Sequence, residues 1–331
     1  MDVDVFAAAH GAQWARLDDL ARRRRLTGRE ADELVRLYRQ GATHLSVLRS
    51  TAPDPALVSQ LSVSLVRARA RIASPHDLTW RHTLHFLTRT IPAALYRVRW
   101  WSVAVTLACL AVIVTTAVWT GSHPDVLDAM MSPEEQRHYA EQAFAAYYSE
   151  YPNASFAALV WTNNALIAAL CIATGITGLY PAQVLFFNSL NVGVAAAVMH
   201  RFDGAWVFYS LILPHGLLEL TCVFVAGAAG MRLFWSWLVP GPRSRGQSLA
   251  QEGRTTMVIV VALVLGLFVS GLIEGFVTPS GLNPWLKIAI GALACAGWWV
   301  VTFVLGRRAV ELGTDPGLSD EEARAEVAVT G

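Results

Sequence analysis

The chain has 331 residues, of which 54% are hydrophobic and only 15% are charged, with a net charge of +1. This composition excludes an ordinary soluble globular protein and indicates an integral membrane protein. The charges are unevenly distributed, because sixteen of the 26 basic residues precede Trp100 and all sixteen are arginines. The four cysteines all fall inside apolar stretches, which is typical of small buried side chains and not of a disulfide framework.

Residues 1–75 predict a cytoplasmic, arginine-rich helical region that is soluble. Thr27 and Glu30 have the spacing of a capping box, so a helix is expected to begin there. The sequence Pro-Asp-Pro at 53–55 interrupts the chain, and a second helix is expected over about residues 56–72.

Residues 76–99 alternate aromatic and aliphatic side chains with arginines, a pattern typical of a basic amphipathic juxtamembrane helix. In the first interpretation this helix lies on an anionic membrane surface, and in the second it packs on the soluble region. The basic residues expected to face lipid headgroups in the first interpretation are Arg81, Arg89, Arg97 and Arg99.

Six membrane spans follow by hydropathy, which predicts an all-α, polytopic protein with a six-helix bundle in residues 100–306. The expected spans cover about residues 100–120, 155–179, 182–200, 206–238, 256–277 and 285–306. An extracytoplasmic helical segment is expected within residues 121–154. It should contain a helix that begins at Ser132-Pro133-Glu134-Glu135 and runs to about Tyr148.

The distribution of basic residues predicts the orientation. With the N-terminus in the cytoplasm, 23 arginines lie on the inner side, and only Arg137, Arg201 and Lys287 lie on the outer side. Both termini are therefore expected in the cytoplasm of a bacterial plasma membrane, including an acidic tail at 307–331. Because the arginines precede a membrane span, they favour lipid headgroups over nucleic acid as partners.

A polar layer is predicted inside the bundle. The residues expected to form it are Asn163, Asn164, Asn188, Asn191, His215, Glu219 and Glu274. One interpretation is that these groups hold helices together through hydrogen bonds. The other is that they line a solute or ion path, since an ionisable carboxyl group in a membrane is a functional-site hypothesis.

The fourth span concentrates these signals. His215, Glu219 and Cys222 have helical spacing and so share one stripe. A metal site would need a third ligand, for which Cys222 is the obvious candidate, but no His-Glu-x-x-His motif is present and no metal or cofactor is expected. Pro214 and Gly216 predict a helix break, with a short piece followed by a full helix from Pro214.

Several motifs together resemble the stage II sporulation protein M family over nearly the whole chain. They are Trp14 with Leu37-Tyr38-Arg39, Asn163-Asn164, Phe-Phe-Asn188, Pro214-His215-Gly216-Leu-Leu-Glu219 and Ile273-Glu274-Gly275-Phe-Val-Thr278-Pro279. The resemblance is to a member of actinobacterial type with a cytoplasmic N-terminal helical region. The sporulation member of that family is a polytopic protein that recruits partners remodelling peptidoglycan during engulfment. Relatives of this type are often encoded beside a MoxR-type ATPase.

Two functions follow as hypotheses. In the first, the chain is a non-enzymatic scaffold that recruits membrane or cytoplasmic proteins into a cell-envelope complex. In the second, it is a transporter or channel, in which the polar layer binds a solute or a proton-coupled ion. No catalytic residues are predicted, because the sequence shows neither a nucleophile with its base nor a phosphate-binding glycine loop. The sequence leaves open whether the chain forms a homo-oligomer.

Overall fold

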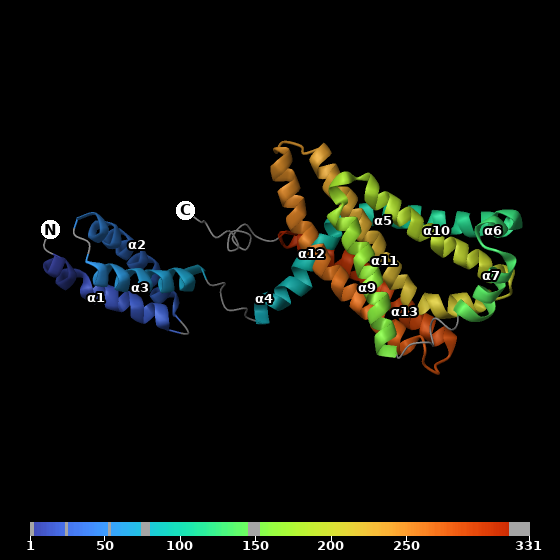
Figure 1. The fold of residues 1–331 in the computed structure, drawn as a ribbon, viewed down its shortest axis with the longest axis horizontal. Coiled ribbons are helices and arrows are strands. Elements are labelled where there is room, and N and C mark those ends of the chain that lie inside the picture. Colours follow the sequence, from blue (N-terminus) through green and yellow to red (C-terminus); the bar gives the residue numbers. More distant parts are fainter. Residues whose placement is uncertain (1–2, 24–25, 52–53, 74–79, 145–152, 318–331) are drawn as a thin grey trace. The chain divides into compact units, whose positions relative to one another are not determined.

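A computed structural model describes residues 3–23, 26–51, 54–73, 80–144 and 153–317. Over these residues the chain is all-α, which confirms the predicted fold class. The helices form two compact units, one within residues 1–79 and one within residues 80–319 (Figure 1). The acidic tail predicted at 307–331 lies outside the described residues from 318 onward.

The first unit consists of α1 (Val3–Arg22), α2 (Gly28–Thr51) and α3 (Pro55–Ala73). The predicted capping box is confirmed, because Glu30 accepts hydrogen bonds from the backbone N–H and the hydroxyl of Thr27, and Thr27 accepts one from the Glu30 N–H. A leucine-rich core joins the three helices, formed by Leu17, Leu20, Leu34, Leu37, Leu48, Leu61, Leu65 and Ala68. This unit therefore has a hydrophobic core of its own.

The second unit opens with α4 (Trp80–His85), a π-helical turn η1 (Phe86–Thr90) and α5 (Ile91–Ser122). These form one continuous helical stretch, and Thr83–Ser122 is long and apolar enough to span a membrane, so residues 91–99 continue without a break into the first candidate span. The π-helical turn lies just before Pro92, whose ring and missing N–H do not fit a regular α-helical ladder. Leu95 and Val98 are buried in the bundle core.

Three short helical pieces follow α5, namely α6 (Pro124–Met130), α7 (Pro133–His138) and the π-helical η2 (Tyr139–Ala143). The start predicted at Ser132 is confirmed by a capping box in which Ser132 and Glu135 bond each other's backbone N–H groups. The end predicted near Tyr148 lies outside the described residues.

The remaining helices complete the bundle. They are α9 (Asn153–Ala173), the short η3 (Gly175–Thr177), α10 (Leu179–Arg201), α11 (Ala205–Leu238), α12 (Arg245–Leu272) with η4 (Ile273–Val277), and α13 (Pro284–Val300) with η5 (Val301–Leu305) and α14 (Gly306–Glu311). Among the described residues, five helical stretches are long and apolar enough to span a membrane, which indicates a multi-pass membrane protein. The predicted span at 155–179 corresponds to α9. Its part Val160–Ala173 is apolar but shorter than the five candidate spans.

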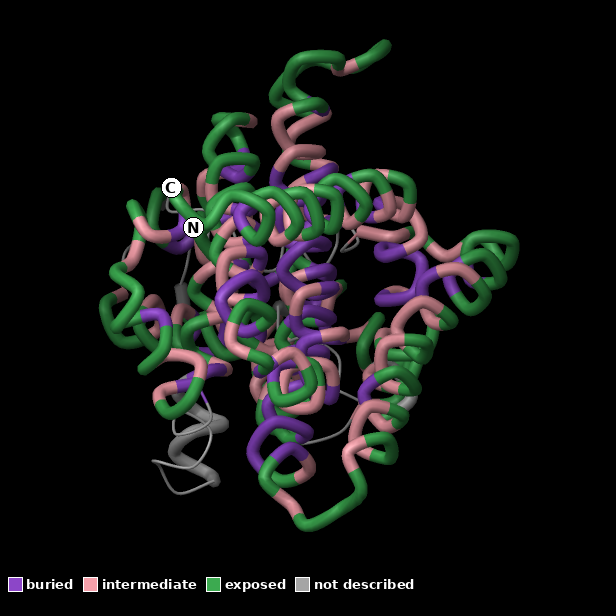
Figure 2. Tube along the Cα trace, turned by 90° about the vertical axis from the view of Figure 1, so that its right-hand side faces the viewer, coloured by how far each residue is buried: buried purple, intermediate pink, exposed green. Residues whose placement is uncertain are grey.

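Helix α11 occupies the centre of this unit, where it contacts α5, α9, α10, α12 and α13. Its residues from Pro214 to Gly230 are mostly buried, and the buried residues of the bundle follow the central helices (Figure 2). Close approaches at glycines make this packing possible. A Cβ at Gly230 would clash with the carbonyl oxygen of Cys171, and one at Gly291 would clash with that of Pro214.

The helix break predicted at Pro214 and Gly216 is not observed, because α11 runs as one helix of 34 residues through both positions. A proline removes one backbone donor and crowds the preceding turn, but packed neighbouring helices can hold such a helix together. Gly291 of α13 lets its backbone approach Leu213 and Pro214 closely, which supports α11 at this point.

Candidate functional site

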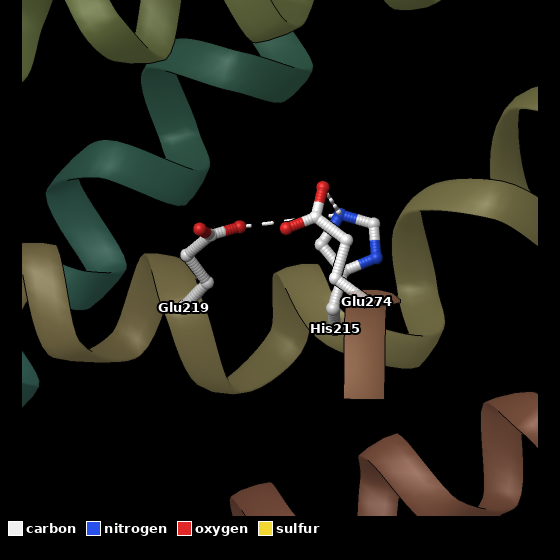
Figure 3. Close-up of side chains that lie close together, drawn as sticks. All are labelled: His215, Glu219 and Glu274. Carbon is white, nitrogen blue, oxygen red and sulfur yellow. Dashed lines mark ion pairs between the residues drawn. The ribbon is translucent and has the colours of Figure 1, made fainter. Parts of the chain in front are cut away.

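A cluster of one histidine and two glutamates lies buried in the second unit. His215 and Glu219 lie one turn apart on α11, and Glu274 comes from the π-helical η4 at the end of α12. The three side chains point toward one another (Figure 3). The Nε2 atom of His215 lies 4.0 Å from Oε2 of Glu219 and 3.7 Å from Oε1 of Glu274. None of the three residues is more than 7% exposed.

Neighbouring helices orient two members of this cluster. Asn164 of α9 donates a hydrogen bond of 2.5 Å to Oε1 of Glu219, which leaves Oε2 directed toward His215. The hydroxyl of Thr278 lies 3.4 Å from Nδ1 of His215 and also reaches the carbonyl oxygen of Ile273 at 3.3 Å. If the hydroxyl donates to that carbonyl, it accepts from the Nδ1–H. The lone pair of His215 then lies on Nε2 and faces the carboxylates.

Glu274 is held less completely. Its Oε1 atom faces His215, whereas Oε2 is buried and has no hydrogen-bond partner among the residues that the structure describes. A buried carboxylate oxygen without a partner is costly, and such a group calls for an explanation. The cluster therefore brings two acidic groups together with one imidazole in an apolar environment.

The structure brings together four of the seven residues predicted for the polar layer, namely Asn164, His215, Glu219 and Glu274. Asn163 is exposed on α9. Asn188 and Asn191 line a surface groove of about 300 Å³ with Tyr180 and Ile167. The sequence gives the positions of these asparagines along α10. The rotation of α10 about its axis decides that they face the groove.

Cys222 shares the α11 stripe, as its spacing indicates, but it lies further along α11 than Glu219 and packs beside Gly266 of α12. The third potential ligand next to His215 and Glu219 is Glu274 instead. The π-helical turn at η4 is a feature common at functional sites, because its extra residue changes the direction of the side chains that follow.

A second charged cluster was missed by the sequence reasoning. Glu252 of α12 is 4% exposed and accepts hydrogen bonds from Nε of Arg232 at 2.5 Å and from Nη2 of Arg97 at 2.9 Å. Arg232 also donates to the backbone carbonyl of Arg97 at 2.7 Å. The available signal was a glutamate just before the apolar run of α12. Arginines also lie near the start of α5 and near the end of α11.

The four arginines predicted to face lipid headgroups have different surroundings. Arg89 is exposed on η1, while Arg99 lies over the Tyr96 ring at 3.6 Å. Arg97 pairs with Glu252, a carboxylate that it shares with Arg232. The side chain of Arg81 lies outside the described residues.

Comparison with known proteins gives two family matches. The family described as Stage II sporulation protein M matches residues 103–279, which is more than half of the chain. A domain of unknown function, DUF8413, matches residues 4–74, the region of the three-helix unit.

Two relatives are uncharacterized proteins of Methanocaldococcus jannaschii. One is 26% identical over 127 residues, which cover 36% of this chain and 69% of the relative. The other is 23% identical over 122 residues, and the match spans about half of that relative, 54% of its length and 36% of this chain. No solved structure matches.

Proposed function

Because the chain belongs to the stage II sporulation protein M family, we propose that it is a scaffold of a bacterial plasma-membrane complex, which recruits partners through its N-terminal unit. The observation that carries this proposal is the separate three-helix unit with its own leucine core. A folded module attached to a membrane anchor is suited to binding other proteins.

The surface of α3 supports this role. Val63 and Val66 lie one turn apart and are 45% and 68% exposed, and Arg67 lies beside them. Exposed apolar side chains at helical spacing suit a protein surface, whereas the Arg67 charge is paired with Asp18 of α1 at 3.1 Å. A MoxR-type ATPase is the first partner to test, since the family resemblance suggests it.

The proposal includes the orientation predicted from the basic residues, with six spans, α9 among them, and with both termini in the cytoplasm. The short turn between α9 and α10 and the loop after α11 then face the cytoplasm, and α6 and α7 face outward. Arg89, which is exposed just before α5, would lie near the inner membrane surface.

Partner recovery tests the scaffold function. The full chain and a variant lacking residues 1–75 are expressed in the native host, cross-linked and purified, and the bound proteins are compared. We expect truncation to abolish recovery, and Val66→Glu to reduce it at least tenfold while the leucine core stays folded. Equal recovery by the truncated chain would refute the proposal. An unchanged unfolding midpoint of the membrane unit is the control for folding.

A second candidate function is transport of an ion through the bundle. The buried His215, Glu219 and Glu274 favour it, since ionisable groups inside a membrane commonly mark ion paths. Reconstituted liposomes should then show pH-dependent flux that is lost in Glu219→Gln and kept in Glu141→Gln, which changes an exposed carboxyl group. Flux that is equal in the two variants would exclude this function.

A further inference from the structure

We propose that His215, Glu219 and Glu274 form a binding site for a divalent transition-metal cation of the Zn²⁺ type. The ligand atoms are Nε2 of His215, Oε2 of Glu219 and Oε1 of Glu274. One potential ligand atom from each residue lies within 4.8 Å of the others, and all three residues are buried. The site goes beyond both proposed functions and depends on neither.

The distances suit a small cation. Ligands at about 2.1 Å from a tetrahedral zinc ion are roughly 3.4 Å from one another. The observed separations from Nε2 of His215 are 3.7 Å to Glu274 and 4.0 Å to Glu219. These two separations exceed that value by a few tenths of an ångström, whereas the three ligand atoms together lie within 4.8 Å of one another, so the two carboxylates also have to approach each other on binding. Side-chain rotation alone supplies such a movement, because the carboxyl groups of Glu219 and Glu274 sit on flexible stems.

Outer contacts prepare the ligands as they do in known metal sites, where a ligating histidine bonds through its other nitrogen and a ligating carboxylate accepts a further hydrogen bond. Thr278 occupies the Nδ1 side of His215 at 3.4 Å. Asn164 donates a hydrogen bond of 2.5 Å to Oε1 of Glu219. Ser270 donates to the backbone carbonyl of His215 at 3.0 Å, which ties α12 to α11 at the same level.

The unpartnered oxygen of Glu274 is an independent indication of a ligand. Glu274 is 2% exposed and its Oε2 atom has no hydrogen-bond partner among the described residues. A cation bound to Glu274 would satisfy this carboxylate, either through both oxygens or by neutralising its charge. Two carboxylates and a neutral imidazole together carry two negative charges, so one divalent cation makes the buried site neutral.

The ligand types select among cations. Sodium, magnesium and calcium prefer sites built from oxygen atoms, and magnesium keeps several waters. An imidazole nitrogen with two carboxylates instead suits zinc, manganese or iron. The three protein ligands leave further coordination positions open, which is the arrangement of zinc sites that also bind water or a substrate.

Metal binding is measured on the full-length chain in detergent, without a histidine tag and after treatment with a chelator. Competition against a chromophoric zinc chelator gives the affinity and the number of ions per chain. We expect one Zn²⁺ per chain, with affinity lowered at least a hundredfold in Glu274→Gln and in His215→Ala. The variant Glu141→Gln is the matched control and should bind as the unchanged protein does.

Two measurements on the unchanged protein keep the test independent of variant folding. X-ray absorption of the zinc complex should show one nitrogen with oxygen ligands and no sulfur, and Zn²⁺ should raise the unfolding midpoint. The proposal fails if no zinc binds, if Cys222 or another sulfur ligates it, or if well-folded Glu274→Gln binds with unchanged affinity. None of these failures bears on partner recovery by residues 1–75, so the scaffold proposal is tested separately.

Discussion

The two buried charged clusters of the membrane unit differ in how completely they are satisfied. Glu252 and Glu274 lie near opposite ends of α12 and its π-helical extension, about 30 Å apart at about 1.5 Å per residue. Glu252 accepts hydrogen bonds from two guanidinium groups. Glu274 faces one imidazole and a second carboxylate, and one of its oxygens has no partner among the described residues. The first cluster is complete without a ligand, whereas the second gains from one.

The difference has a physical cause that bears on function. A buried ion pair is tolerated when geometry and additional hydrogen bonds offset the loss of water, as Arg97 and Arg232 do for Glu252. The Glu274 cluster lacks such compensation, because one carboxylate oxygen has no partner among the described residues. Unsatisfied polar groups in an otherwise well-packed bundle are expected at functional sites. We therefore interpret the Glu252 cluster as structural and the Glu274 cluster as functional.

The largest effect is expected from Glu252→Ala. The substitution leaves two arginines in the bundle without their counter-ion, and breaking a buried pair in this way costs about 3 kcal/mol. Thermal unfolding in detergent should show a clear fall in the midpoint. The control is Glu311→Ala, which removes an exposed pair with Arg307 and should have no measurable effect. Equal midpoints in the two variants would mean that the Glu252 cluster contributes no stability.

The opposite sign is expected from Glu274→Met in chelator-treated protein. Methionine removes the unpartnered oxygen and keeps a side chain of similar length, so the free energy of unfolding should rise by about 1 kcal/mol. The same unfolding measurement tests this, and added Zn²⁺ should stabilise the unchanged protein but not the variant. A loss of stability as large as that of Glu252→Ala would show that Glu274 is structural, which would erase the contrast between the clusters.

An effect on affinity and not on folding is expected from Asn164→Ala. Asn164 orients Glu219 without being a proposed ligand, and loss of such an outer contact typically weakens metal binding about tenfold to a hundredfold. Competition with the chromophoric chelator measures the change, and Asn163→Ala, one residue away and exposed, is the control. Equal affinities for the two asparagine variants would remove Asn164 from the site.

The smallest effect is expected at Asp128, which lies outside the candidate spans. Hydrogen bonds from Arg201 and Gln136 hold the pKa of Asp128 below its ordinary value of 3.8. A carboxyl group with a lowered pKa stabilises the fold at higher pH, and this contribution is lost as the pH falls below about 4 through the folded pKa. Asp128→Asn should flatten the acid part of the stability curve slightly. An identical curve would show that the contact contributes nothing.

Local rules predicted the features that depend on neighbours in the chain. The capping boxes at Thr27 and Ser132 were predictable because their partners lie three residues away, and His215 and Glu219 were predictable as a pair because helical spacing brings them to one face. Among the described residues, five of the six expected spans coincide with helices that are long and apolar enough to cross a membrane, because both assignments depend on length and apolar composition.

The sequence by itself thus determined the helical class, five candidate spans and the stripe on α11. Only the tertiary structure decided that Glu274 is the third member of the cluster, that Glu252 binds Arg97 and Arg232, and that Asn188 faces a groove. The rotation of each helix sets these contacts, and that rotation depends on how side chains and glycines of different helices fit together. Gly291 against Pro214 is one such fit, at the point where α11 runs on unbroken although the sequence predicted a break.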